Sequence, residues 1–313
     1  MKLLYVTSSS FSGSTLLAFL LNTHPDIFTV SEMEGWDYGE DEEFYCSCGN
    51  PLERCPFFSE VAQAFQHDSL PFAWRDFGTA YRLAKSERLN RYLTERLPWL
   101  GSSRLERLRD SVIAHTPGFA GRLRRHDQAN KIFVRTALAY SKASVFVDGS
   151  KNPFRLRLLR RVRDFDLRVL YLIRDFRGVA LSNMKTRGCD PRLATEIWLH
   201  DQSNILRVLA EFPGALHVYY EDLCEHVDDT LATIHRFVGQ TPNPFPGSFK
   251  ASEHHILGNT MRLEGDAKIR KNERWKSELS PEQLQTITSV AENFANSHVS
   301  HPLSDIIRHY LES

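Results

Sequence analysis

The strongest chemical signal in the sequence is the segment 7–17, which reads TSSSFSGSTLL. It follows a short apolar run and begins a stretch with helical spacing. Small residues let a backbone curl so that several N–H groups point at one anion, and hydroxyls at the positive end of a helix add donors. The segment therefore predicts a phosphate-binding loop. We expect its ligand contacts at Ser10, Phe11, Ser12, Gly13, Ser14, Thr15 and Leu16.

This loop differs from the P-loop of nucleotide-hydrolysing proteins. The lysine of the G-x-x-x-x-G-K-[ST] pattern is absent, because Gly13 is followed by Ser14. No strand end offers a clear acidic partner for Mg²⁺. A kinase that uses ATP and Mg²⁺ is therefore a weaker alternative, and the N-terminus of an ordinary core helix is the non-functional interpretation.

A second anion site is predicted at the end of the apolar run Val169–Ile173. Arg174 follows this run directly, and Ser182 comes eight residues later on a predicted helix. A guanidinium group presents a planar fork that matches phosphate oxygens, and a serine hydroxyl can complete such a pocket. An ion pair between Arg174 and Asp175 is the alternative interpretation.

Two more predicted strand ends carry charged residues. Lys151 ends the segment VFVDGSK and would place a positive charge where negative charge shifts during a reaction. Glu32 follows the run Ile27–Val30 and could act as a general base, with Glu34 in reserve. In open α/β sheets ligands bind beyond the carboxyl ends of the strands, so these loops are expected to share one site.

The secondary-structure elements that must position these residues are predicted to be strands that alternate with helices. Short β-rich runs occur at 3–6, 27–30, 145–147, 169–173 and 216–220, and helical spacing occurs at 14–21, 154–162, 178–185 and 194–209. This alternation predicts an α/β, P-loop-like, three-layer fold with a central, mainly parallel sheet. We expect one domain over 1–313, with an Arg-rich helical insert at about 46–142 and a C-terminal lid at about 250–280.

The overall composition excludes several classes of protein. The chain of 313 residues has 39 Lys+Arg and 39 Asp+Glu, which disfavours binding of nucleic acid through phosphate contacts. No window of about 20 apolar residues occurs, so no membrane span is expected. An odd number of cysteines, five, does not indicate a secreted disulfide framework. The expected compartment is the cytoplasm.

The segment CSCGNPLERC at 46–55 places three thiols in ten residues. Such thiols could bind zinc with one further ligand, for which His67 is the nearest histidine, or could form a disulfide. The C-x-C spacing is less typical of structural zinc sites than C-x-x-C. We therefore favour reduced, packed cysteines and assign no metal.

These motifs together resemble the sulfotransferases that use 3′-phosphoadenosine-5′-phosphosulfate (PAPS). Residues 7–17 resemble the family's 5′-phosphosulfate loop, and the pair Arg174 and Ser182 resembles its 3′-phosphate motif. Lys151 is similar to the strand-end lysine that contacts the transferred sulfuryl group. The segments 258–262 and 269–275 resemble a lid common in bacterial members, which adds Arg262 and Trp275 to the expected cofactor contacts. Trp275 or Phe176 could stack on adenine.

The sequence departs from the family's pattern at two positions. Phe11 stands where many members have Lys or Arg, so another cation must help the leaving group. Pro153 stands where the cytosolic branch has its catalytic histidine, which shifts the base to Glu32, as in the carbohydrate and tyrosyl branch. The resemblance thus implies metal-independent transfer of a sulfuryl group from PAPS to a hydroxyl of a carbohydrate, a lipid or another small molecule, with PAP as product. The alternatives are a non-catalytic nucleotide-binding protein and, less favoured, the kinase.

Overall fold

A computed structural model describes residues 1–34, 44–74, 76–95, 103–250, 252–258, 260–263 and 268–312. Its centre is a five-stranded sheet in which every neighbouring pair is parallel, in the order β2-β3-β1-β4-β5. The strands are β1 (Lys2–Thr7), β2 (Ile27–Thr29), β3 (Val145–Lys151), β4 (Asp166–Ile173) and β5 (Leu216–Tyr219). All five predicted strands are confirmed, and the sheet is wholly rather than mainly parallel.

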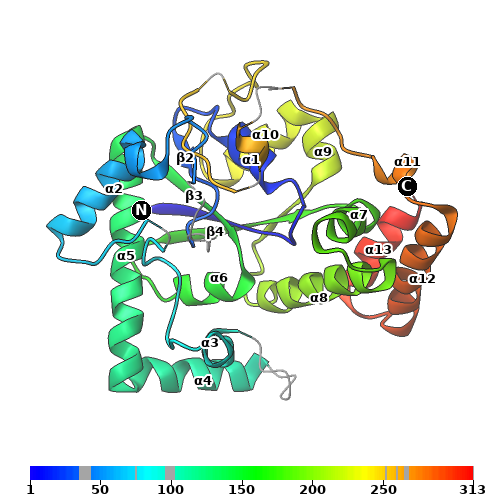
Figure 1. Cartoon of the computed structure of the whole chain (residues 1–313), viewed down its shortest axis with the longest axis horizontal. Helices are drawn as coiled ribbons and strands as arrows, with labels where there is room; N and C mark the ends of the chain where they lie inside the picture. Colours follow the sequence, from blue (N-terminus) through cyan, green and yellow to red (C-terminus); the bar gives the residue numbers. More distant parts are fainter. Residues whose placement is uncertain are drawn as a thin grey trace.

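Helices cover both faces of this sheet (Figure 1). On one face α1 (Ser14–Leu21), α9 (Tyr220–Glu225) and α10 (Val227–Phe237) share a core with the even-numbered residues of β1, Leu4 and Val6. On the other face α6 (Pro153–Leu159), α7 (Phe176–Arg187) and α8 (Pro191–Leu209) pack with Leu3 and Tyr5. Strands buried on both faces read as continuous apolar runs, which explains why the sequence showed them clearly.

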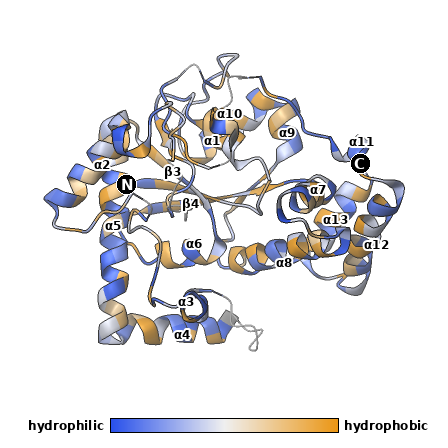
Figure 2. Ribbon diagram, viewed as in Figure 1, coloured by the Kyte–Doolittle hydropathy of each residue, from blue (hydrophilic) through white to orange (hydrophobic). Residues whose placement is uncertain are grey.

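The segment between β2 and β3, called the insert below, is helical. It contains η1 (Leu52–Arg54), α2 (Pro56–His67), α3 (Glu87–Thr94), α4 (Ser103–His115) and the long α5 (Pro117–Ser141). The chain ends with η2 (Thr260–Leu263), α11 (Trp275–Glu278), α12 (Pro281–Ser297) and α13 (Pro302–Glu312). Figure 2 shows polar and apolar residues alternating along α5, α8 and α12, as expected for helices with one buried side. Within the described residues, no helix has the length and apolarity needed to cross a bilayer.

One buried charge joins the insert to the sheet. The Arg155 side chain, at the beginning of α6, is 1% exposed, and its Nε and Nη2 atoms lie 3.1 and 3.0 Å from Oδ2 of Asp148 on β3. Its Nη1 donates to the carbonyl of Thr79 (2.6 Å), and its Nη2 also donates to Oδ1 of Asn130 (2.6 Å). Thr79 and Asn130 both belong to the insert, so one guanidinium connects β3, α5 and the loop before α3.

Removing this guanidinium should destabilise the protein strongly. In Arg155→Met the side chain fills much of the same space, but the Asp148 carboxylate is left buried without its cation. Losing one partner of a buried pair costs about 3–5 kcal/mol of unfolding free energy. Urea unfolding followed by circular dichroism measures the loss.

The matched control is Arg308→Met, which removes a pair on α13 whose arginine is 39% exposed. A solvated pair contributes about 1 kcal/mol or less. Equal losses in the two variants would contradict the role given to Arg155.

Candidate functional site

The chemically equipped loops lie together because all five strands point the same way. The loop after β1 leads to α1 on one face of the sheet, whereas the loop after the neighbouring β4 leads to α7 on the other face. Loops that diverge in this way leave a crevice at the carboxyl edge, where open α/β sheets bind their ligands. The two predicted anion-binding motifs therefore lie side by side at this edge of the sheet, on the two sides of the expected crevice.

The loop after β1 has the strained backbone expected of an anion cradle. Phe11 and Gly13 have positive φ angles of 61° and 87°, and α1 begins at Ser14. The hydroxyls of Ser9 and Ser12 are 2.8 Å apart, and Gln202 donates to Ser9. The loop is thus held in shape by a hydrogen bond of its own and by one from α8, and it leads directly into the N-terminus of α1.

The position of the Tyr220 ring explains why residue 13 must be glycine. A Cβ atom on Gly13 would lie 2.4 Å from Cδ2 of the Tyr220 ring, a distance that real contacts do not reach. The same ring has the Arg174 guanidinium carbon 4.4 Å from its centroid. Tyr220 therefore supports both motifs from the first turn of α9.

Arg174 connects the two predicted anion sites. Its side chain is largely buried, its Nη1 donates to the carbonyl of Phe11 (2.6 Å), and its Nη2 donates to the carbonyl of Asn272 (3.0 Å). Ser182 lies on α7, where its hydroxyl donates to the carbonyl of Gly178 one turn earlier (3.0 Å). A Cβ on Gly178 would be 3.4 Å from both Arg174 Nη2 and Trp275 Cδ1, so these three residues lie close together.

Lys151 and Glu32 form an ion pair at the neighbouring strand ends. The Lys151 Nζ atom is 2.5 Å from Oε1 of Glu32, and the two side chains are 24% and 15% exposed. Their backbones are joined nearby, because the N–H of Gly149 donates to the carbonyl of Ser31 (2.5 Å). A Cβ on Gly258 would lie 3.3 Å from Glu32 Oε1 and 3.4 Å from Thr15 Oγ1. The pair is therefore enclosed between the phosphate loop and the C-terminal segment.

Glu34 faces a different environment from Glu32. It lines a cavity of about 320 Å³ between α6 and the insert, together with Tyr81, Asn90 and Asn152. Burial raises the pKa of Glu34 to about 7, against the lowering effect of Arg155. The two candidate bases thus have different surroundings. Glu32 forms an ion pair with Lys151, whereas Glu34 lines the cavity.

The remaining predicted cofactor contacts have mixed outcomes. Trp275 begins α11 and has the Arg177 guanidinium 4.1 Å from its ring centroid. Arg262 is buried and donates to the carbonyls of Tyr45 and Gly258, which gives it a structural role; its contact with a cofactor stays a prediction. Phe176 is fully buried beside Trp198, so the expectation that it could stack on adenine was wrong.

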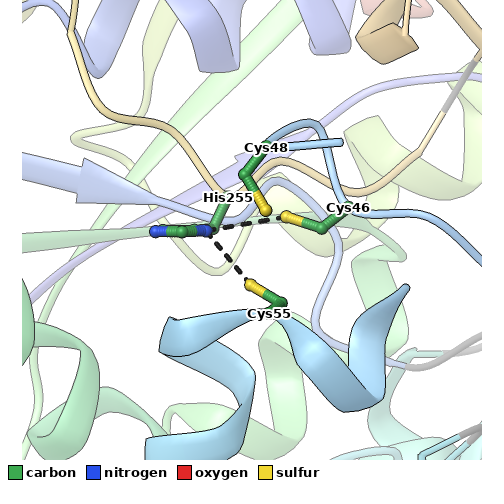
Figure 3. A group of neighbouring side chains, drawn as sticks. All are labelled: Cys46, Cys48, Cys55 and His255. Carbon is green, nitrogen blue, oxygen red and sulfur yellow. Dashed lines mark hydrogen bonds between the residues drawn. The ribbon is translucent and has the colours of Figure 1, made fainter. Parts of the chain in front are cut away.

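The cysteine cluster also differs from the expectation. His67 is not its neighbour: the side chain is 87% exposed and contacts Asp68. His255, from the C-terminal segment, lies against Cys46, Cys48 and Cys55 instead (Figure 3). All five cysteines are free, so the disulfide alternative is not observed. Sequence proximity misled here because the fourth group comes from about 200 residues away.

Sequence reasoning missed several residues of the site. Tyr220 and Asn272 shape the Arg174 pocket, and the Ser8 hydroxyl is buried with no hydrogen-bond partner among the described residues. The sequence Tyr219-Tyr220-Glu221-Asp222 gave a signal for Tyr220, since this residue stands at the end of the predicted strand 216–220. Asn272 acts through its main-chain carbonyl, which no side-chain pattern reports.

Comparison with known proteins adds information about the fold. No protein-family model and no curated protein matches the sequence. A solved sulfotransferase domain from the curacin biosynthetic pathway superimposes with a TM-score of 0.50 over 91% of this chain and 95% of that domain, at 16% identity. This chain has the fold of a sulfotransferase domain.

A second similar structure is the sulfotransferase domain of the olefin synthase from Synechococcus PCC 7002. The alignment covers 93% of this chain and 94% of that domain, with 19% sequence identity and a TM-score of 0.49. The α/β fold predicted from the alternation of β-rich runs and helical spacing is confirmed by the five-stranded parallel sheet and by the curacin-pathway domain. In this sulfotransferase fold, the predicted phosphate loop and Arg174 lie side by side.

The requirement for glycine at position 13 can be tested by substitution. Gly13→Ala adds a methyl group that meets the Tyr220 ring and forces an L-residue into left-handed backbone, so the unfolding free energy should fall by about 1–3 kcal/mol. Urea unfolding measures the change. Gly188→Ala is the control, because its φ of 64° is also left-handed but its Cβ would meet nothing within 4 Å. If both variants lose the same stability, the Tyr220 contact is unimportant.

Proposed function

We propose that the protein is a sulfotransferase that moves the sulfuryl group of PAPS to a hydroxyl of an acceptor. The observation that carries the proposal is the hydrogen bond from Arg174 to the carbonyl of Phe11. It brings the loop suited to a 5′-phosphosulfate next to the arginine suited to a 3′-phosphate. A ligand with two separated anionic groups fits this arrangement better than one with a single phosphate chain.

The residues of the crevice fit the proposed cofactor. The N-terminus of α1 and the unpartnered Ser8 hydroxyl would donate to the 5′-phosphosulfate. Arg174 and Ser182 would hold the 3′-phosphate, and Trp275 lies close enough to Arg174 to contact the adenosine. The missing cation at Phe11 is offset by Lys151 at the end of the adjacent β3.

The pair of Lys151 and Glu32 supports the proposed chemistry. PAPS would supply the sulfuryl group, whose bond to the phosphate oxygen breaks as a bond to the acceptor oxygen forms. Glu32 would take the proton of the acceptor hydroxyl, and Lys151 would stabilise negative charge on the transferred group. The Lys151 ammonium and the N–H groups of the loop would supply this stabilisation, so the transfer would need no metal.

The acceptor would enter from the side of the insert. The cavity beside Glu34 is lined by polar groups of Tyr81, Asn90 and Asn152, which suits a hydroxylated carbohydrate, lipid or other small molecule. The odd number of cysteines, which does not indicate a secreted disulfide framework, supports a cytoplasmic location.

Transfer of labelled sulfuryl from PAPS to a panel of hydroxylated glycans, lipids and phenols tests the proposal. Thermal stabilisation by PAP, compared with ATP and Mg²⁺, is measured in parallel. Stabilisation by PAP without transfer to any acceptor would favour the non-catalytic nucleotide-binding protein. Stabilisation only by ATP and Mg²⁺ would favour the kinase.

Arg174→Ala should weaken the binding of PAP. A hydrogen bond to a charged group contributes about 1.5 to 3 kcal/mol, which corresponds to roughly a ten- to 150-fold loss of affinity. Isothermal titration calorimetry measures the dissociation constant. Arg160→Ala serves as the control, because Arg160 is 56% exposed and pairs with Glu211, away from the crevice. An unchanged affinity in Arg174→Ala would exclude this residue from the nucleotide site.

Glu32→Gln should lower the turnover number by about 10²-fold or more, since it removes the general base. The affinity for PAP should change less than twofold. Glu34→Gln is the matched comparison: because Glu34 lines the proposed acceptor cavity, this variant should change the KM for the acceptor but lower the turnover number much less than Glu32→Gln does. The opposite pattern would make Glu34 the base, and the wild-type rate would then rise with pH through about 7, because the pKa of Glu34 is raised by burial and the carboxyl must lose its proton to act.

A further inference from the structure

The group of Cys46, Cys48, Cys55 and His255 has the composition and shape of a metal site. Its four potential ligand atoms all lie within 4.8 Å of one another, and Cys46, Cys55 and His255 are buried. Figure 3 shows the three sulfur atoms gathered on one side of the imidazole ring. None of these residues takes part in the proposed sulfuryl transfer, so the cluster requires its own explanation.

The distances agree with tetrahedral zinc coordination. The Nδ1 atom of His255 is 3.7 Å from the Cys46 sulfur and 3.2 Å from the Cys55 sulfur. With Zn–S bonds of about 2.3 Å and Zn–N bonds of about 2.0–2.1 Å, an ideal tetrahedron separates nitrogen and sulfur ligands by about 3.6 Å. Only a small adjustment of the side chains would therefore be needed to accept an ion.

The histidine is already oriented as a metal ligand. Its Nε2 atom is 2.9 Å from Oε1 of Glu253 and 3.2 Å from the hydroxyl of Tyr140. Its ring stacks on Phe57 with the centroids 5.5 Å apart. When one imidazole N–H donates a hydrogen bond to a carboxylate, the lone pair of the other nitrogen is left for a metal. The contact with Glu253 thus directs the lone pair of Nδ1 toward the thiols.

The sulfurs of Cys46 and Cys55 both lie against the Nδ1 atom of His255. One metal ion would bind these atoms and the Cys48 sulfur at once. Protein groups would then fill all four positions of a tetrahedron, and three of the four residues are buried, which matches a structural rather than a catalytic zinc site.

The backbone is built to bring the two segments together. The N–H of Ser47 donates to the carbonyl of Ile256 (3.2 Å), and the N–H of Ile256 donates to the Ser47 hydroxyl (2.7 Å). Between Cys48 and Asn50 the chain turns at Gly49, whose φ is 85°. The N–H of Leu257 donates to the carbonyl of Val30, two residues before Glu32. The cluster therefore lies where the insert, the C-terminal segment and the strand that leads to Glu32 meet.

We propose that Cys46, Cys48, Cys55 and His255 bind one structural zinc ion that fastens the C-terminal segment to the beginning of the insert. This proposal reverses the expectation of metal-free cysteines. It is independent of the proposed sulfotransferase activity, because the ligands lie outside the crevice. The ion would fix the position of Gly258, whose backbone packs against Glu32 and Thr15.

The test uses the full chain, expressed without a histidine tag and purified without chelator. Mass spectrometry of the metal content should find about one zinc per chain, as a closed four-ligand site holds its ion through purification. Replacement by Co²⁺ should produce a thiolate-to-cobalt charge-transfer band and the intense d–d bands of tetrahedral cobalt. Zinc below about a tenth of an equivalent, together with no such cobalt spectrum, would overturn the proposal.

Variants identify the ligands. Cys48→Ser changes the partly exposed member of the cluster and should reduce zinc affinity tenfold or more, and Glu253→Gln, which changes the support of His255, should reduce it about tenfold. Cys189→Ser and His67→Gln are the matched controls and should keep full zinc. Wild-type affinity in Cys48→Ser would overturn the assignment.

A thiol titration separates zinc from a disulfide and does not require any variant to fold. The wild-type chain, purified without reductant and unfolded in the presence of a chelator, should present all five cysteines as free thiols. The loss of two thiols that peptide mapping assigns to Cys46, Cys48 or Cys55 would show that a disulfide occupies the cluster, and the zinc proposal would be wrong.

Discussion

The ion pair between Arg155 and Asp148 is the interaction on which the arrangement of the site depends. The carboxylate lies on β3 three residues before Lys151, and the guanidinium is held at the same time by the Thr79 carbonyl and the Asn130 amide oxygen of the insert. A charge so deeply buried is stable only while all of its partners are in place. The position of the insert is therefore tied to the strand that presents the lysine.

Much of the fold could be predicted from the sequence because both faces of the sheet are buried. Strands with no solvent-facing side appear as uninterrupted apolar runs, and the loops after them were identifiable by their unusual content of serine, glycine and charge. Parallel strands then place these loops at one edge. The proximity of Arg174 to the phosphate loop follows from that topology, since β1 and β4 are neighbours.

The rest of the site depends on contacts that no local pattern encodes. His255 joins three cysteines from the other end of the chain, and Asn272 acts through a carbonyl group. The difference between Glu32 and Glu34 is equally hidden in the sequence, because it arises from their surroundings. Glu32 forms an ion pair with Lys151, whereas Glu34 is enclosed by the insert beside Arg155.

The central place of β1 has a consequence for how the protein folds. Lys2 on β1 pairs with Val145 on one side and with Asp166 on the other. Both edges of this strand can therefore be covered only after about 160 further residues have been made. Pairings between such distant segments form slowly and leave apolar strands exposed meanwhile. While the insert is being synthesised, β1 has neither of its neighbouring strands to pair with, and its apolar residues need protection from aggregation.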